Sequence, residues 1–523
     1  LSLFTRVSCI LKYQCIKECI VNVSPKNHWR KFNKYRYYAT AINLKVDAQN
    51  VVSSGLPDIS GFENIYLHDF IWEKIGRWSN HTALVCANTG RSYTYGQLKK
   101  ACSKLATSLR KSKLLSGDTI AIILPNIPEF AIIVLAANEA GLRTTLINPV
   151  HTIHEIKRQL EKMDAQAIFT FPAKHIDIKA SIEKNSKIKL PIVIVNDGTS
   201  SISGTIQLND LLRDDIEDFS ISQKTGINCE DTVLLPYSSG TTGLPKGVEL
   251  SHRNIVANLL QGADPMSFAG IETSEHHQDI VPLILPMYHC YGLLIVLYTY
   301  LRYVNIIGAK LVCLPQFSME EFIKLLENHR CTLLHLVPSI VQMMIYDERI
   351  TSRHIESMRL TLVGAAPIGE KLITKFNIRF TNNINFIIGF GMTEPSAIVS
   401  MNSINTSTFS CGYLIPNTQM RIVSTLGKNL GLLYVAPTEL EEIIRHYNNI
   451  EDIAVIGVAH KNYGEIPKAF IVPKSGVKIN ENELKEFVAK HVAKYKQLGH
   501  VQVIESIPKS ASGKILRKEL ENL

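Results

Sequence analysis

The chain has 523 residues, 46% of them hydrophobic and 20% charged, which is an ordinary globular composition and enough length for more than one buried core. Its formal charge of +9 is concentrated at the start, because residues 1–46 hold nine Lys or Arg against one acid and so carry +8, which leaves +1 for the rest. The nearly neutral body gives no compositional support for a nucleic-acid-binding protein.

Residues 1–46 have the composition of a presequence, with many cations, almost no acids and no apolar run of secretory length. This segment resembles a mitochondrial transit peptide, so a mitochondrial location is expected. An untranslated or misassigned leader is the alternative. Peroxisomal or cytoplasmic locations also stay open, although the terminal Glu521-Asn-Leu523 differs from the peroxisomal Ser-Lys-Leu signal. The ten cysteines are scattered without a CxxC pair, which argues against disulfides and a zinc site.

The first third of the folded body alternates apolar strands with helical patterns, which predicts an α/β fold. Helices are expected to begin at Leu67 and Tyr95, and a third is expected from Pro128 to Ala140, where Gly141 ends it. Further elements are expected at 83–86 (strand), 117–124 (strand), 154–160 (helix) and 167–170 (strand).

A stretch rich in glycines and hydroxyls lies near the middle of the chain, at 237–248. The glycines allow the backbone N–H groups to turn toward one point, the hydroxyls add hydrogen-bond donors, and a lysine supplies positive charge. This combination predicts a phosphate-binding loop. Its expected nucleotide-binding residues are Ser238, Ser239, Gly240, Thr241, Thr242, Gly243 and Lys246.

The flanks of this loop predict that it joins two strands. A buried strand is expected at 232–236 and an extended run at 248–250, after which Ser251 should cap a helix at 252–261. The spacing differs from the Walker-type G-x-x-x-x-G-K-[ST] loop, whose lysine opens a helix. A flexible Gly/Ser/Thr linker is the structural alternative.

The ten residues 238–247 resemble the phosphate loop of the adenylate-forming superfamily, which includes acyl-CoA synthetases, 4-coumarate:CoA ligases and beetle luciferases. The strands and helices before it also resemble the N-terminal subdomain of that superfamily. The resemblance implies a large domain of stacked α/β subdomains, a small mobile α+β C-terminal domain, and the use of ATP, Mg²⁺ and coenzyme A.

A histidine and two tyrosines follow at the expected strand-to-helix junction 285–293. In the resembling superfamily this histidine, here His289, stands at the wall of the acyl pocket near the carboxylate and α-phosphate, and Tyr291 lines the pocket. A core histidine with a purely structural role is the alternative. The apolar run 293–301 is too short to span a membrane and is expected to be a core helix.

Two apparent metal motifs have simpler explanations. His154-Glu155 begins like HExxH, but Arg occupies position 158. His276 and His277 lie among acids, but their spacing does not place two imidazoles on one helical face, so a solvated loop is expected.

Two glycine segments come next. Residues 364–369 follow an expected strand and precede an expected helix, which is where doubly wound sheets hold ligands. Residues 388–394 are expected to form a second glycine turn. The resemblance implies that Phe390 stacks on adenine, Thr393 reaches the phosphate and Glu394 holds Mg²⁺. The other nucleotide-binding positions expected here are Gly364, Ala365, Gly389 and Gly391.

The C-terminal segment 507–517 resembles the terminal motif of the superfamily, whose lysine is here Lys514. A carboxylate that attacks the α-phosphate brings two anions together, and a cation between them lowers the barrier. Lys514 fits that role, and the resemblance implies that His289 and Thr393 are catalytic residues as well. A basic tail on a solvated surface is the alternative.

The resemblance breaks off after 422–431 and resumes at 435–441, so about sixty residues that the superfamily carries there are missing. That block holds the acid that binds ribose, the Asp-Arg-x-Lys hinge and the Lys-Gly segment that lines the thiol tunnel. We interpret this chain as a splice form or an imperfect gene model of an active ligase.

The sequence thus predicts an ATP-dependent acid-thiol ligase that forms an acyl-adenylate and then an acyl-CoA thioester from a small carboxylic acid, as a monomer or homodimer. The expected parts are a leader (1–46), a large AMP-binding domain (47–426), a shortened hinge (427–434) and a small domain (435–523). Two alternatives stay open: a luciferase-like monooxygenase, and a catalytically impaired nucleotide-binding isoform.

Overall fold

The computed structural model describes most of the chain after residue 44. Four predicted segments lie outside the described part. They are the leader up to 44, the centre of the phosphate loop (239–245), the hinge, and residues 510–514, which include Lys514. The described residues are 45–46, 51–182, 187–196, 201–213, 228–238, 246–263, 271–301, 308–380, 384–403, 410–421, 437–460, 464–492, 497–509 and 515–523.

The N-terminal part of the large domain is built on a seven-stranded sheet with the order β13-β10-β6-β5-β7-β8-β9. All neighbours are parallel except β13, which pairs antiparallel with β10. Every residue of β5 and β7 is buried, as expected for parallel strands covered on both faces. The strands are β5 (Thr119–Ile123), β6 (Arg143–Leu146), β7 (Ala165–Thr170), β8 (Val193–Ile194), β9 (Ile206–Gln207), β10 (Thr232–Leu235) and β13 (Leu250–Ser251). The helices of this part are α2 (Tyr95–Lys111), α3 (Pro128–Glu139), α4 (Ile153–Lys162), η2 (Pro172–Lys174), α5 (His175–Ile182), α6 (Leu208–Leu211) and α7 (His252–Gln261).

The rest of the large domain contains a four-stranded sheet (β14-β15-β3-β4) and a five-stranded sheet (β16-β17-β18-β19-β20). The backbone N–H of Thr332 donates to Ile280 O and so connects the two sheets. Strands β16, β17 and β18 are parallel, whereas β19 and β20 run antiparallel. The strands are β3 (Thr82–Cys86), β4 (Ser92–Thr94), β14 (Ile280–Leu283), β15 (Lys310–Cys313), β16 (Leu333–Leu336), β17 (Leu360–Val363), β18 (Asn385–Met392), β19 (Ala397–Met401) and β20 (Tyr413–Leu414). The helices are α1 (Leu67–Trp72), η1 (Ile75–Trp78), η3 (Tyr291–Tyr298), α8 (Thr299–Leu301), α9 (Met319–Asn328), α10 (Pro338–Tyr346), η4 (Ser352–Ile355) and α11 (Glu370–Phe380).

Two small sheets complete the large domain. One joins its beginning to its end, because β2 pairs with both β1 and β21. The other is a hairpin of β11 and β12 at the predicted phosphate loop. The strands are β1 (Lys45–Val46), β2 (Val51–Ser53), β11 (Tyr237–Ser238), β12 (Lys246–Gly247) and β21 (Gln419–Arg421).

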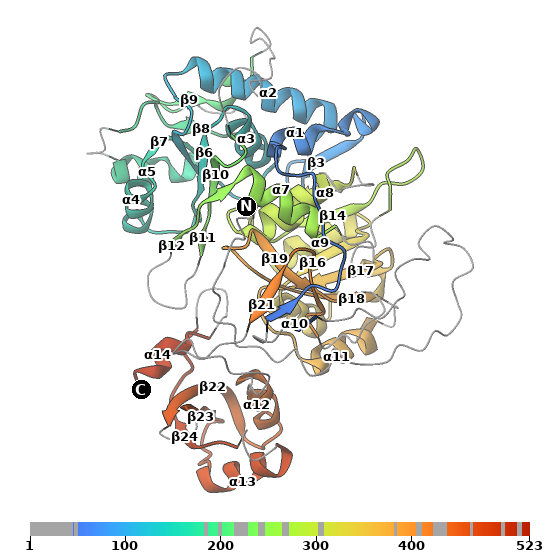
Figure 1. Ribbon diagram of the computed structural model, residues 1–523, viewed down its shortest axis with the longest axis vertical. Helices are drawn as coiled ribbons and strands as arrows, with labels where there is room; N and C mark the ends of the chain where they lie inside the picture. The colour runs from blue at the N-terminus through green and yellow to red at the C-terminus, as the bar shows by residue number, and fades with distance from the viewer. Residues whose placement is uncertain are drawn as a thin grey trace.

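The small domain forms a separate body, drawn in red at the lower end of Figure 1. Its three-stranded sheet has the order β22-β23-β24. Two apolar clusters pack on this sheet, one with α12 and α13 and one with the last segment of the chain. The elements are α12 (Pro437–Ile444), β22 (Ile450–His460), β23 (Gly464–Pro473), α13 (Glu481–His491), β24 (His500–Val503) and α14 (Arg517–Glu521).

The structure confirms the predicted fold class, a large α/β domain followed by a smaller α+β domain. The capped helix is also confirmed: α7 spans His252–Gln261, and the side chain of Ser251 accepts from the backbone N–H of Asn254. The predicted core helix is helical too, but η3 is a π-helix. No helix among the described residues is both long and apolar enough to cross a membrane.

One prediction was wrong. The glycines at 389 and 391 do not form a turn, because both lie within β18, which is held on one side by β17 and on the other by β19. The glycine-rich segment predicted a turn from local preference, and pairing with β19 overrides that preference.

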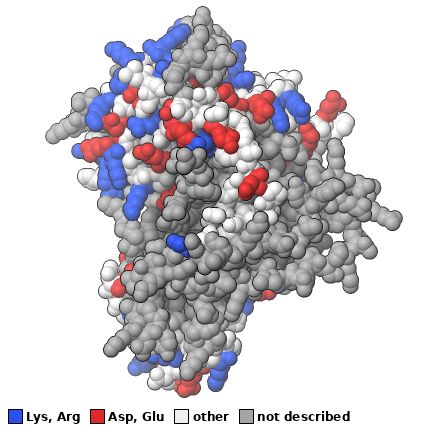
Figure 2. Space-filling model, viewed as in Figure 1, with Lys and Arg blue, Asp and Glu red and all other residues white. Residues whose placement is uncertain are grey.

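The described surface carries cations and acids side by side. Figure 2 shows Lys and Arg side chains interspersed with Asp and Glu over the upper part of the molecule. This mixture agrees with the nearly neutral charge of the chain after its leader.

Candidate active site

The predicted phosphate loop is closed at its base by a short hairpin, as expected for a loop that joins two strands. Tyr237 pairs with Gly247 and Ser238 pairs with Lys246. Ser238 is only 8% exposed, and its Oγ has no hydrogen-bond partner among the described residues. Because a buried hydroxyl without a partner is costly, this orphan donor fits an anionic ligand such as a phosphate. The predicted residues Ser239, Gly240, Thr241, Thr242 and Gly243 lie outside the described part.

Helix α7 ties this hairpin to the five-stranded sheet. Its N-terminus is fixed by a capping box, in which Ser251 and Asn254 bond each other's backbone. Farther along, the side chain of Asn258 donates to Ile398 O (2.9 Å) and accepts from Ile398 N (3.0 Å). The helix that follows the predicted phosphate loop is therefore bonded directly to β19, the partner strand of β18.

The β18–β19 hairpin has a strained tip. Its register shifts between Phe390 and Gly391, and a Cβ at Gly391 would collide with the Ala397 carbonyl oxygen, so this position requires glycine. Ser396 and Ala397 both have positive φ, 64° and 104°, which is unfavourable for residues with side chains. Such strain is typical of functional sites.

This tip presents the predicted phosphate and metal residues. Thr393 is buried at 6% exposure, whereas Glu394 is exposed. Phe390, the predicted adenine contact, is partly exposed on β18 and is paired across the hairpin with Ser400.

The turn after β17 meets β18 and η3. Ala365 has a φ of 66°, a left-handed conformation that alanine rarely adopts. A Cβ at Gly364 would lie 3.2 Å from Tyr291 Cε1 and 3.4 Å from Gly389 O. Segments around 291, 364 and 389, which are far apart in the sequence, thus pack directly against one another.

The predicted acyl-pocket residues lie where the chain enters η3. His289 is exposed, and Tyr291 is 6% exposed with its hydroxyl donating to Leu362 O at 3.1 Å. Burial raises the pKa of Tyr291 well above its ordinary value, so the phenol stays neutral. A Cβ at Gly292 would collide with Pro286 O. Only glycine therefore allows the first turn of η3 to lie so close to Pro286.

Cys290 contacts two of the predicted catalytic residues. The sequence analysis did not predict it as a site residue. Its Sγ lies 3.8 Å from His289 Nδ1 and 3.7 Å from Thr393 Oγ1. Burial alone would raise the pKa of this thiol. The neighbouring His289, together with hydrogen bonds from Thr393 and the Tyr291 backbone, outweighs burial and lowers the pKa below its ordinary value.

A second residue missed by sequence reasoning, His335, supports Tyr291. It lies on β16 at 1% exposure, with its ring edge-on to Tyr291 at 5.8 Å between centroids. Its Nε2 is 2.7 Å from the Tyr300 hydroxyl. Burial lowers the pKa of His335 to about 3, so the imidazole is neutral at physiological pH and adds no charge beside Tyr291.

The exposed carboxylate of Glu394 fits a magnesium ion that is bound mainly by the phosphates of a nucleotide. Among the described residues, no group of three or more His, Cys, Asp or Glu side chains could hold a metal ion, and His277 instead faces Asp279 at 3.1 Å. Mg²⁺ in phosphate-transferring sites usually takes one or two carboxylates and completes its shell with water and phosphate oxygens. Glu394 would supply one carboxylate of that kind.

The small domain approaches the large domain at α11. Lys371 Nζ lies 4.0 Å from Glu442 Oε1 on α12, and a Cβ at Gly369 would lie 3.6 Å from Glu442 Oε2. Both charged side chains are more than one-third exposed, so the pair is weak and easily broken. That property suits a domain expected to move.

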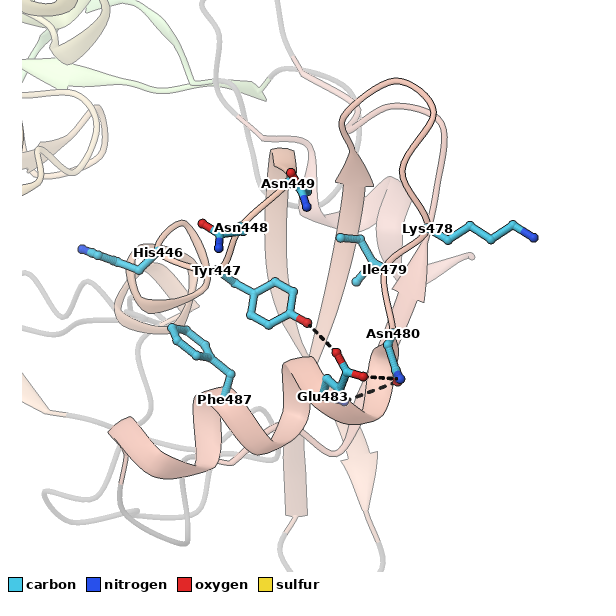
Figure 3. A pocket seen from close by; sticks show the side chains of 9 residues that line it. All are labelled: His446, Tyr447, Asn448, Asn449, Lys478, Ile479, Asn480, Glu483 and Phe487. Atoms are coloured by element: carbon cyan, nitrogen blue, oxygen red, sulfur yellow. Dashed lines mark hydrogen bonds between the residues drawn. The ribbon is translucent and has the colours of Figure 1, made fainter.

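The small domain also has an open cavity of about 540 Å³, which is not the predicted site. Its lining includes Tyr447, Asn480, Glu483 and Phe487 (Figure 3). The Tyr447 hydroxyl donates to Glu483 Oε2 (3.3 Å) and Asn480 Nδ2 donates to Glu483 Oε1 (2.9 Å). These polar groups satisfy one another, and none of the predicted site residues lines this cavity.

The sequence is similar to known AMP-binding enzymes. The family model of AMP-binding enzymes matches residues 71–436, and the family model of the AMP-binding enzyme C-terminal domain matches residues 439–514. The chain is 30% identical to 4-coumarate:CoA ligase 1 of Petunia hybrida, over 90% of this chain and 96% of that protein. It is 28% identical to 4-coumarate--CoA ligase 1 of Arabidopsis thaliana, over 90% of this chain and 94% of that protein. The fold is similar to that of ATP-bound MatB from Rhodopseudomonas palustris, with a TM-score of 0.68 and 21% identity over 88% of this chain and 98% of MatB.

The alignment with the petunia protein also shows how many of its positions have no counterpart in this chain. The alignment has 539 positions, but 90% of 523 residues is about 471, so about 68 positions have no counterpart here. This difference is similar in size to the block that the sequence analysis finds missing near the hinge.

Proposed function

The chain belongs to the AMP-binding enzyme family, and from that premise we propose that it is an ATP-dependent ligase that joins a carboxylic acid to coenzyme A. The relatives at 28–30% identity are 4-coumarate:CoA ligases. None of the comparisons favours the luciferase-like alternative.

One observation carries this proposal: Tyr291, Gly364 and Gly389 are packed together at the end of a parallel sheet. The carboxyl ends of parallel strands are the usual ligand sites in open α/β folds. Thr393 joins them through its contact with Cys290. The carboxylic acid and the nucleotide would meet at this point, where a carboxylate oxygen could attack the α-phosphorus.

In the first half-reaction, a carboxylate oxygen attacks the α-phosphorus and the bond to pyrophosphate breaks. Ser238 and Lys246 would hold the phosphates at the mouth of the loop, and Thr393 would donate to the α-phosphate. Glu394 would hold Mg²⁺, which when bound offsets the charge of the phosphate oxygens. Lys514 would stand between the two anions as they approach.

In the second half-reaction, the sulfur of coenzyme A attacks the acyl carbon and AMP leaves with the former carboxylate oxygen. The small domain is expected to rotate between the two steps. His289 and the neutral Tyr291 would position the acyl end throughout.

The experiment separates the two half-reactions. Purified protein is mixed with ATP, Mg²⁺ and a panel of phenylpropanoid, medium-chain and longer fatty acids, with labelled pyrophosphate added for the first half-reaction and coenzyme A for the second. Acid-dependent exchange of labelled pyrophosphate into ATP reports adenylation, and mass spectrometry of acyl-CoA reports thioester formation. Exchange and acyl-CoA with one class of acid support the proposal, whereas no acid-dependent exchange with any acid contradicts it.

The missing block favours a second candidate, a nucleotide-binding protein with impaired catalysis. Loss of a carboxylate that bonds the ribose would remove interactions worth on the order of 1.5–3 kcal/mol. This candidate predicts that labelled ATP binds but that no acid yields acyl-CoA. Sequencing of full-length transcripts across 431–435 would show whether a longer product exists.

We also propose that the protein is directed to mitochondria. The support is the charge of residues 1–46, which carry nine Lys or Arg and one acid. A fluorescent protein fused behind these residues should enter mitochondria, and the same fusion with the cations replaced by Gln should not.

A further inference from the structure

The side chain of Asn126 joins two sheets of the large domain. Asn126 follows β5 of the seven-stranded sheet and is 6% exposed. Its Nδ2 donates to the carbonyl oxygens of Leu283 (3.0 Å), the last residue of β14 in the four-stranded sheet, and of Leu285 (2.9 Å). Its Oδ1 accepts from the backbone N–H of Met287 (2.9 Å). One buried amide thus holds three alternate residues of the chain where it leaves β14.

These contacts require an amide. The nitrogen of Asn126 donates two hydrogen bonds and its oxygen accepts one. A carboxylate of the same shape could make only the last of these bonds, and an aliphatic side chain could make none. Buried backbone groups that lose their partners are costly. The residue type at 126 is therefore set by backbone groups of a distant segment.

The chain around Asn126 is itself held firmly. Helix α3 begins at Pro128, and the next residue, Glu129, is 4% exposed. Glu129 accepts from Arg91 Nη2 at Oε2 (2.8 Å) and from the Tyr93 hydroxyl at Oε1 (2.9 Å). Hydrogen bonds to a charged group are among the strongest in proteins. Asn126 therefore reaches the second sheet from a rigid base.

The segment that Asn126 holds leads directly into the predicted acyl site. The backbone N–H of His289 donates to Pro286 O (3.1 Å). Pro286 lies between Leu285 and Met287, two of the residues that Asn126 bonds. The place of His289 on this turn therefore depends on where Asn126 holds the chain.

The same turn orients the ring of His289. The backbone N–H of Tyr291 donates to His289 Nδ1 (3.2 Å). Because Nδ1 is the acceptor in this contact, the neutral imidazole carries its proton on Nε2. The direction of this ring donor is set by the backbone at 289–291, directly after the segment that Asn126 holds.

We propose that Asn126 is a positioning residue for adenylation, because it holds the turn that carries His289 and Tyr291 to the acyl end of the site. This inference rests on the proposed function, in which these two residues position the carboxylic acid. Asn126 acts through backbone contacts and lies outside the predicted nucleotide-binding segments. Its loss should therefore weaken the use of the acid more than the binding of ATP.

A buried amide at the opposite end of β5 supplies the matched control. Gln166 is 7% exposed, and its Oε1 accepts from the backbone N–H of Thr119, the first residue of β5 (2.6 Å). Asn126→Leu and Gln166→Met each replace a buried amide with an apolar side chain of similar size. Both variants should lose stability, but only Asn126→Leu should disturb the site.

The first test measures pyrophosphate exchange with the panel acid that the unaltered protein uses fastest. In Asn126→Leu, kcat/KM for the acid should fall on the order of 10- to 100-fold, because a misplacement of about 1 Å has effects of that size. The KM for ATP should change less than about twofold, since ATP binding is not removed. Gln166→Met should match the unaltered protein in both constants, per folded molecule.

A purely structural amide would give a different pattern. It would lower the folded fraction, while kcat/KM for the acid stayed constant per folded molecule, and that result in Asn126→Leu would overturn the proposal. Asn126→Ser replaces Asn126→Leu if the latter does not fold, because the smaller side chain leaves room for a bridging water, and it should show the same split between acid and ATP. Failure of both variants to fold would assign Asn126 to folding and overturn the proposal as well. If the unaltered protein shows no acid-dependent exchange, it is the proposed function that fails.

The second test does not depend on activity. Cys290 directly follows His289 and is 5% exposed, so its reaction with a maleimide reports how firmly the turn is held. Labelling of Cys290, measured by mass spectrometry, should be on the order of tenfold faster in Asn126→Leu than in the unaltered protein and in Gln166→Met. Cys102, which is fully buried in α2, should label equally slowly in all three proteins. Equal labelling of Cys290 in all three would contradict the anchoring role.

Discussion

Gly364 lies against the ring of Tyr291, so closely that a Cβ at this glycine would stand 3.2 Å from Tyr291 Cε1. The ring has little freedom to move away, because its hydroxyl is bonded to Leu362 O and His335 lies edge-on beside it. This contact joins the predicted acyl wall to the predicted nucleotide turn.

Gly364→Ala should therefore disturb the site. The added methyl forces a shift of Tyr291 or of the Gly389 carbonyl, and overpacking of this kind costs about 1–3 kcal/mol in the free energy of unfolding. Urea unfolding measures that loss, and the KM for the acid should rise. Gly76→Ala is the control, because no atom lies within 4 Å of its added Cβ. Equal stability of the two variants would show that the contact is loose.

Thr393 should contribute through its hydroxyl. Thr393→Val keeps the shape but removes the donor to a charged phosphate, a loss of about 1.5–3 kcal/mol, or roughly 10- to 150-fold in exchange rate. Thr393→Ser, which keeps the hydroxyl, should retain most of the rate. Comparable rates in the Val and Ser variants would remove Thr393 from the reaction.

The buried histidines predict loss of stability in acid. Burial lowers the pKa of His335 to about 3, and burial with the charge of His68 lowers that of His252 to about 3. Both are neutral in the folded state but take up a proton near pH 6.5 when unfolded, so their contribution is full above pH 6.5 and is lost as the pH falls toward 3. Each would lower the free energy of unfolding by about 1.4 kcal/mol per pH unit below 6.5.

His335→Gln isolates one of these contributions, because glutamine does not titrate and still offers an acceptor to the Tyr300 hydroxyl. Urea unfolding between pH 4 and pH 7 should show a shallower pH dependence in this variant. An equal slope in the two proteins would mean that folding does not lower the pKa of His335.

Cys290 should react with a maleimide before four of the other described cysteines. Its pKa is lowered by its surroundings, whereas burial raises the pKa of other described cysteines, namely Cys102, Cys229, Cys313 and Cys331. The thiolate is the nucleophile, so labelling at neutral pH should favour Cys290 and slow when ATP and acid cover it. Mass spectrometry of labelled peptides checks the order. Earlier labelling of any of the four would contradict it.

Local signals predicted much of this fold. Ser251 and Asn254 were close enough in sequence to indicate a capped helix, and the apolar run at β5 indicated a buried strand. The strand at Gly389 could not be predicted, because pairing with Met401 of β19 imposes it on a glycine-rich segment.

The missed residues depend on contacts between distant segments. Cys290 matters because Thr393, 103 residues later, lies beside it. His335 matters because the hydroxyl of Tyr300, 35 residues earlier, lies 2.7 Å from its Nε2. Periodicity and motif spacing carry no information about such pairs.

The central claim is that this chain joins a carboxylate to the α-phosphate of ATP and that Lys514 assists that step. It is tested most directly by acid-dependent pyrophosphate exchange in the unaltered protein and in Lys514→Ala, with ATP binding measured in parallel by equilibrium dialysis. Lys474→Ala, which removes an exposed lysine of the same domain, is the control. The predicted result is exchange in the unaltered protein and in the control, and none in Lys514→Ala, although all three bind ATP. Unchanged exchange in Lys514→Ala, or no acid-dependent exchange in the unaltered protein, would contradict the claim.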